Sequence, residues 1–325
     1  MASGPALGAI SSVAAASALL ALHGPAAAHG FVGERFFPAT LATDDPFVAD
    51  ELSAPTVSSR KMPAAGDEPA TPETEYSFEF SKRITPRLGL SLEDAYQVKN
   101  PSDGPKVSGW SNAELGLTYQ FFTDEASEAV ASASLGWEIE RTGTDRVGAD
   151  PFSTLTPSIQ AGKGFGNLPD TLAWLRPLAV TGIVRVAIPL RAKTRTATFD
   201  PGSGSLDVEI ERHPDVLQWG GSVQYSLPYL QANVRDLGLP EAVGRVIPLV
   251  EFVMETPLNR GEAGHTTGTI NPGFVWVGQK VQFGVEMEIP VNDRSGHWLG
   301  FVAQLHFYLD DLFPTTLGRP LVEWR

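Results

Sequence analysis

Acidic side chains recur at alternate positions in several segments of this 325-residue chain. In residues 281–289, apolar residues at the odd positions alternate with Gln282, Gly284, Glu286 and Glu288 at the even positions. A period of two places successive side chains on opposite faces of a β-strand, so these carboxylates share one polar face. Carboxylates that line a wet interior favour cations over anions. The same alternation places eight candidate residues on polar faces that would line the interior: Glu114, Glu138, Arg185, Glu251, Glu286, Glu288, Gln304 and His306.

Segments with this alternation follow one another from residue 76 to residue 309, and they must position these side chains. Most of the segments are about 10 residues long or longer. Strands of soluble sheets are usually about 5 to 6 residues long, whereas about 10 tilted residues cross a bilayer. The polar faces are rich in Gly, Ser, Gln and Glu, which suits a wet interior. The pattern therefore favours an all-β fold, an antiparallel transmembrane β-barrel, over a soluble β-sandwich. The predicted strands are 74–83, 87–97, 111–123, 128–141, 153–165, 174–192, 215–230, 244–257, 267–277, 280–291 and 297–309.

The connections between these eleven segments alternate between short and long. Bacterial single-chain barrels have an even number of strands, short periplasmic turns and longer extracellular loops. The alternation therefore requires a twelfth strand upstream, within residues 31–57, and it puts both termini in the periplasm. The longest loop, Lys193–Asp215, has β character of its own and predicts a hairpin above the membrane.

The first 28 residues have the features of a secretory signal peptide, although no basic residue precedes the apolar run. Ala9–Leu22 is too short to span a membrane as a helix, and Ala26–Ala28 offers a small-residue cleavage site. The expected regions are a cleaved signal peptide at 1–28, a periplasmic segment with the first strand and a polar loop at 29–74, the barrel at 75–309 and a periplasmic tail at 310–325.

Composition excludes several other classes of protein. Lys and Arg number 24 against 38 Asp and Glu, a net charge of −14, so nucleic acid is not an expected partner. The chain has no cysteine, which excludes thiolate metal sites and cysteine nucleophiles. After residue 29 no stretch approaches 18 uninterrupted apolar residues, which excludes an α-helical membrane protein.

The remaining candidates for chemistry give weak signals. His29 would become the N-terminal residue after cleavage, where an amine and an imidazole can chelate copper, but a lone terminal histidine is usually incidental. His213, His265 and His297 fall at loop ends without metal-ligand spacing, so we expect no metal and no other cofactor. His306 with a serine such as Ser222 could supply a base and a nucleophile, but no Gly-x-Ser-x-Gly motif accompanies them. We therefore expect that this protein is not an enzyme.

The alternation over residues 76–309 resembles that of bacterial outer-membrane β-barrels, most closely the transporter barrels linked to the meta-pathway of phenol degradation. Residues Gly300–Phe307 look like the closing-strand signal of such barrels, with aromatic residues at alternating positions. Those barrels usually end at an aromatic residue, whereas this chain continues to Trp324 and Arg325. The resemblance implies a Gram-negative outer membrane, lipid as the surroundings, the outer-membrane assembly machinery as a partner and passage of an unspecified small solute.

Three interpretations follow. The first is a passive outer-membrane channel or transporter for a small solute, with a preference for cations owed to the inward acids. The second is a closed structural or binding barrel, because side chains can largely fill the lumen of a barrel of this size. The third is a soluble periplasmic β protein.

Overall fold

Twelve antiparallel strands close into a barrel in this computed structural model, which describes residues 30–64, 69–200, 202, 205–261 and 263–322. Each strand pairs with the next barrel strand along the chain, and the last pairs with the first, with Gln304 opposite Thr56. The predicted fold class is confirmed. The barrel strands are β3 (Glu51–Met62), β4 (Thr71–Thr85), β5 (Leu88–Lys99), β7 (Glu114–Asp124), β8 (Ala129–Glu138), β9 (Thr154–Gly164), β10 (Leu178–Pro189), β13 (Val216–Tyr225), β14 (Val246–Pro257), β15 (Thr267–Val277), β16 (Val281–Pro290) and β17 (Gly300–Tyr308).

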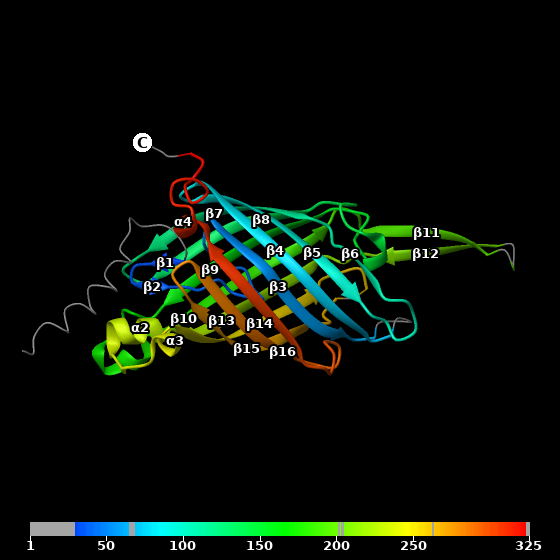
Figure 1. The fold of residues 1–325 in the computed structure, drawn as a ribbon. Coiled ribbons are helices and arrows are strands. Elements are labelled where there is room, and N and C mark those ends of the chain that lie inside the picture. Colours follow the sequence, from blue (N-terminus) through cyan, green and yellow to red (C-terminus); the bar gives the residue numbers. More distant parts are fainter. Residues whose placement is uncertain (1–29, 65–68, 201, 203–204, 262, 323–325) are drawn as a thin grey trace, which may run out of the picture.

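The two ends of the barrel carry different elements (Figure 1). Around one end lie β1 (Phe31–Val32), β2 (Arg35–Phe36), η3 (Asp170–Leu175), α2 (Leu227–Tyr229), η4 (Leu230–Val234), α3 (Glu241–Gly244) and α4 (Leu309–Leu312). At the other end lie β6 (Val107–Trp110), η2 (Asp145–Val147) and the hairpin of β11 (Lys193–Asp200) and β12 (Ser205–Arg212). The hairpin predicted for the longest loop is confirmed, with Ala197 opposite Val208. No helix in the described part of the chain is both long and apolar enough to cross a membrane.

The strand wall is apolar outside and polar inside. Along β7, Leu115, Leu117 and Tyr119 are exposed on the outer face, and Leu117 keeps 42% of its surface accessible. Gly116 and Thr118, between them, line the interior. A belt of exposed apolar side chains around a closed barrel is stable only against lipid.

Residues 226–230 depart from the prediction of one strand over 215–230. The strand β13 ends at Tyr225, and the side chain of Ser226 accepts a hydrogen bond from the backbone N–H of Tyr229 at 3.1 Å. This N-cap, with Pro228 in the first turn, starts the helix α2. The connection from β13 to β14 therefore runs through α2, η4 and α3.

The upstream twelfth strand is β3 at Glu51–Met62, which begins inside the predicted range 31–57 but continues beyond it into the predicted loop. Its pairing with both neighbours shifts by one residue between Ser53 and Thr56, which is a β-bulge. The extra residue keeps Glu51, Ser53 and Thr56 all on the inner face, where they line the interior.

Residues 38–49, which we call the plug, lie inside the barrel against its inner wall. They belong to the region 29–74, for which the sequence predicts a periplasmic segment with the first strand and a polar loop. The base of the plug packs in an apolar cluster in which Val32, Phe37, Val130 and Ala179 are buried and Phe47 lies against them. The signal peptide predicted at 1–28 and the terminal His29 lie outside the described residues.

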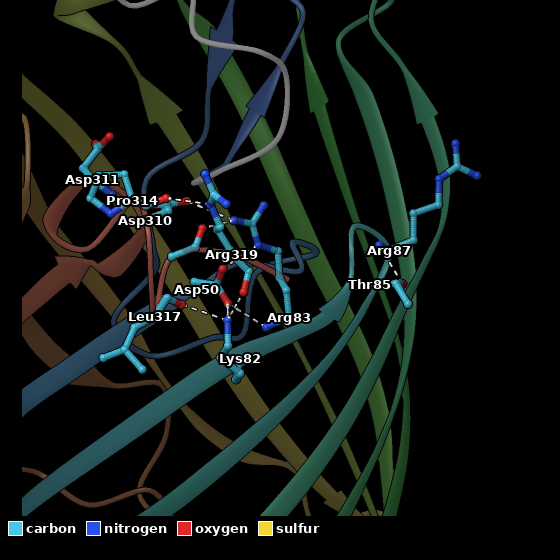
Figure 2. A network of polar contacts seen from close by, with 11 residues as sticks. Asp50, Lys82, Arg83, Thr85, Arg87, Asp310, Asp311, Pro314, Leu317 and Arg319 are labelled. Atoms are coloured by element: carbon cyan, nitrogen blue, oxygen red, sulfur yellow. Dashed lines mark hydrogen bonds and ion pairs between the residues drawn. The ribbon is translucent and has the colours of Figure 1, made fainter. Parts of the chain in front are cut away.

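A network of charged groups fixes the chain where the plug leads into β3 (Figure 2). Asp50 accepts hydrogen bonds from Lys82 Nζ at 2.7 Å and from the backbone N–H and Nε of Arg83, both at 2.8 Å. Arg83 also donates to Gly318 O at 3.0 Å and lies 3.8 Å from Asp310. The network joins the start of β3 to the tail that follows β17, at the seam where the barrel closes.

Candidate functional site

The tip of the plug is held by one carboxylate of the barrel wall. Glu251 on β14 accepts hydrogen bonds from the backbone N–H groups of Leu41, Ala42 and Thr43 at 2.8, 3.1 and 2.9 Å, and from the Thr43 hydroxyl at 3.0 Å. Successive backbone N–H groups form a concave nest that suits an anion. Four hydrogen bonds compensate for burying the carboxylate.

Other wall residues hold the rest of the plug. Gln282 on β16 donates to Ala39 O at 2.7 Å, and Arg185 on β10 donates to the carboxylate of Asp44 at 3.0 Å. Ser132 on β8 donates to Pro46 O. Leu41 lies against Gly284, where a side chain would collide with it. The plug is therefore bonded to several strands and fills the lumen beside β14 and β16.

A cavity of about 270 Å³ remains beside the plug, and we call it the chamber. Its walls are the plug and the inner faces of β3, β4, β5, β7, β8, β9 and β17, together with Arg185 of β10. Serine, threonine and glycine supply much of this lining, including Ser77, Ser91, Gly116 and Thr118. A solute in the chamber would meet hydroxyl and carboxyl groups rather than an apolar pocket.

Four glutamates form a continuous row across the wall. Glu79 on β4 pairs with Glu93 on β5, Glu93 pairs with Glu114 on β7, and Glu114 pairs with Glu138 on β8. Neighbouring strands lie about 4.8 Å apart, and like charges directly opposite one another are destabilising. Glu79, Glu93 and Glu114 line the chamber. Such a row costs stability unless a cation compensates it.

The predicted inner residues divide into two groups. Glu114, Arg185, Gln304 and His306 line the chamber. Glu251 and Glu286 are buried, Glu251 under the plug, and do not face the chamber. Glu138 accepts a hydrogen bond from Asn112 at 2.9 Å and lies at the end of the glutamate row, while Glu288 is partly buried outside the chamber lining. The plug separates Glu251 and Glu286 from the chamber, because it covers β14 and β16.

Glu93 is a chamber residue that sequence reasoning missed. It lies inside the predicted strand 87–97, and its partners across the wall are Glu79 and Glu114. Alternation alone gives the face of a residue within one strand, whereas the register between strands brings the acids into one row.

His306 lies in a chain of polar contacts at the chamber wall. Its Nδ1 is 2.9 Å from Ser53 Oγ, its Nε2 is 3.4 Å from Glu51 Oε2, and only 1% of the residue is exposed. The hydroxyl of Ser222 instead contacts Thr181 Oγ1 at 2.7 Å. A serine hydrolase also needs donors for an oxyanion. We interpret Ser53, His306 and Glu51 as part of the chamber wall.

Two of the loop histidines have separate surroundings. His213 contacts Thr194 Oγ1 at 3.0 Å and stacks on Phe152, while His297 lies beside Asp293 and Trp298. Within the described ranges, no three His, Asp or Glu side chains are arranged to hold a metal ion.

The closed barrel and its apolar exterior decide the location. The protein is an outer-membrane β-barrel. No family model matches the chain, and no curated protein matches it. Solved structures with a similar barrel include an outer-membrane channel from Pseudomonas putida F1, with 11% identity, a TM-score of 0.45, and coverage of 84% of this chain and 99% of that one.

Two further structures illustrate the range of such barrels. The β domain of the Bordetella autotransporter BrkA has 12% identity and a TM-score of 0.47, covering 79% of this chain and 98% of that one. LpxR from Salmonella typhimurium has 12% identity and a TM-score of 0.41, covering 79% and 99%. Similarity this low identifies none of their activities in this chain.

Proposed function

We propose that this barrel is a channel for small solutes that prefers cations, and that the chamber sets the preference. The observation that carries the proposal is the row of cross-strand glutamates, three of which face the chamber. Arg185 is the only lysine or arginine among the described residues of the chamber lining, and it is paired with Asp44. A solute that passes the plug on this side meets a wall lined by carboxyl groups.

A fixed negative charge in a narrow lumen acts at an effective dielectric well below that of water. Cations are therefore attracted into the chamber, and anions are repelled from it. The plug narrows the passage beside β14 and β16, so the proposed solutes are small. The resemblance to transporters of phenol degradation stays a prediction, and no particular solute follows from it.

Reversal potentials in a salt gradient across a planar bilayer test the proposal. The wild type should show a cation-over-anion permeability ratio well above 1 that declines as salt rises, because the Debye length is only about 8 Å at physiological ionic strength. The triple variant Glu79→Gln, Glu93→Gln, Glu114→Gln should bring the ratio close to 1.

Glu241→Gln is the matched control, since it removes a charge from α3, outside the strand wall, and should leave the ratio unchanged. A triple variant that keeps the wild-type ratio contradicts the assignment of selectivity to the chamber. Complete absence of conductance in the wild type instead favours a closed barrel, an alternative supported by the many hydrogen bonds between plug and wall.

A further inference from the structure

We infer that the chamber binds a linear oligoamine, an aliphatic chain carrying two or more ammonium groups, along Glu79, Glu93 and Glu114. This inference rests on the proposed function of the same chamber and specifies the class of cation. It follows from the spacing of the acids, from the lack of a cation paired with any of them, and from an amide oxygen without a hydrogen-bond partner on β17, two strands from Glu79.

The spacing suits a chain of charges rather than a single ion. Three acids on consecutive strands extend over about 10 Å, with neighbours about 4.8 Å apart. Two nitrogens joined by three methylene groups lie roughly 5 Å apart, as the bond lengths require. Each ammonium group of such a chain can therefore face one carboxylate. A single compact ion can neutralise only one part of the row.

The three carboxylates have no cation of their own. In the described part of the chain, no lysine, arginine or histidine forms an ion pair with Glu79, Glu93 or Glu114, and Glu79 has only the hydroxyl of Ser81 at 3.2 Å. Arg185 is the only lysine or arginine among the described residues of the chamber lining, and its guanidinium donates to Asp44 at 3.0 Å. One positive charge therefore serves Asp44, Glu93 and Glu114 together. A ligand with several positive charges would supply the missing compensation.

A second observation points independently to a ligand with N–H donors. Gln304 on β17 is 7% exposed, lines the chamber, and its Oε1 has no hydrogen-bond partner among the described residues. A buried amide oxygen without a donor costs free energy, which an N–H group of a bound ligand would recover. Gln304 lies two strands from Glu79, since β3 separates β17 from β4.

The chamber does not suit a bare metal ion. Its acids are spread along the wall, and no cluster of three metal-ligating side chains occurs in the described ranges. A volume of about 270 Å³ instead accommodates an organic chain. The hydroxyl groups of Thr118 and Ser134, which also line the chamber, add acceptors for ammonium groups.

Thermal unfolding of the detergent-solubilised full-length protein tests binding without any need for conductance. Spermidine should raise the unfolding midpoint in a saturable way, as expected for a ligand that binds only the folded state. Tetramethylammonium and MgCl₂ at matched ionic strength should have at most a tenth of the apparent affinity. An equal effect of MgCl₂ would mean general neutralisation of acids and would overturn the inference.

Variants then locate the site. Glu93→Gln should weaken the apparent spermidine affinity at least tenfold, and Gln304→Leu at least threefold, while Glu241→Gln should leave it unchanged. Glu93→Asp keeps the charge and should restore most of the affinity, which separates binding from a folding defect. Unchanged affinity in both Glu93→Gln and Gln304→Leu would overturn the inference.

Spermidine should also block the cation current from either side of a bilayer at the concentrations that stabilise the protein. A thermal shift without any conductance would refute the channel and retain the oligoamine site. Conductance without a spermidine-specific shift would refute the oligoamine site and retain the channel.

Discussion

Thr43 of the plug makes two hydrogen bonds to the carboxylate of Glu251, from its backbone N–H at 2.9 Å and from its hydroxyl at 3.0 Å. The two hydrogen bonds join Thr43 to a side chain on β14 that lies more than two hundred positions further along the chain. The adjacent backbone N–H groups of Leu41 and Ala42 donate hydrogen bonds to the same carboxylate. This contact fixes which side of the lumen the plug fills, and so which side stays open as the chamber.

Weakening this contact should loosen the plug. Glu251→Gln replaces one carboxylate oxygen with an NH₂ group that faces backbone donors, so we expect a loss of about 1 to 3 kcal/mol in the free energy of unfolding. The looser plug should also raise the single-channel conductance or the open fraction in planar bilayers. Thermal unfolding and single-channel recording measure the two effects.

Glu255→Gln is the control on the same strand, because Glu255 is exposed and hydrogen bonds only to Gln218 at 2.9 Å in the described part of the structure. If Glu251→Gln unfolds like the wild type and conducts like it, the carboxylate does not hold the plug.

Stability should depend on pH through Tyr229 in α2, at the end of the barrel opposite the hairpin of β11 and β12 (Figure 1). Tyr229 is buried under the guanidinium of Arg35, which lies 3.8 Å from the ring centroid, and burial raises the pKa of Tyr229 to about 12. The ordinary pKa of tyrosine is about 10, so between these pH values the folded protein binds more protons than the unfolded chain. This contribution to stability is complete below about pH 10 and is lost as pH rises toward 12.

The measurement is the unfolding midpoint between pH 9 and 12 for the wild type and for Tyr229→Phe. The variant keeps the ring over which Arg35 lies and removes the titrating hydroxyl, so its midpoint should fall less steeply with pH. Parallel curves for the two proteins would contradict the assignment.

Substitutions on the two faces of the wall should differ. Leu117→Arg puts a charge on the lipid face and should cost about 2 to 4 kcal/mol if it lies near the bilayer midplane. Gly116→Arg faces the chamber and its acids and should cost less, because a side chain there meets only the movable hydroxyl of Ser91 closely. Refolding yield and unfolding free energy in lipid vesicles measure both.

Gly284→Arg provides a third case, because the inner face at this position is packed against Leu41 of the plug. We expect it to displace the plug and raise conductance, unlike Gly116→Arg. Equal damage from all three changes would instead fit a structure buried on both faces.

Protease treatment of intact cells should report the orientation. The hairpin of β11 and β12 projects from the end of the barrel opposite α2, α3 and α4 (Figure 1), and we expect it outside the cell. Proteinase K should cleave within Lys193–Arg212 and leave the connection at residues 165–170 intact until the outer membrane is permeabilised. Cleavage at 165–170 on intact cells, with the hairpin spared, would mean the opposite orientation.

Alternation in the sequence determined the architecture of this protein. The segment 280–291 was predicted as a strand and forms β16 at Val281–Pro290, and the even number of strands required an upstream strand, which is β3. A period of two is a local property of the chain: each residue faces inward or outward according to its own position in the strand. The faces of Leu117, Glu114 and Gln304 could therefore be predicted without knowledge of any neighbour.

Only the tertiary structure decided which inner residues meet each other and which are covered. The row from Glu79 to Glu138 depends on the register of four strands, which a single sequence does not encode locally. The plug has no periodicity, and its contact with Glu251 joins positions far apart in the chain. Hydrogen bonds of this kind form only after the barrel encloses the segment. The sequence could therefore predict that Glu251 faces inward, but it could not predict that the plug covers Glu251 and keeps it out of the chamber.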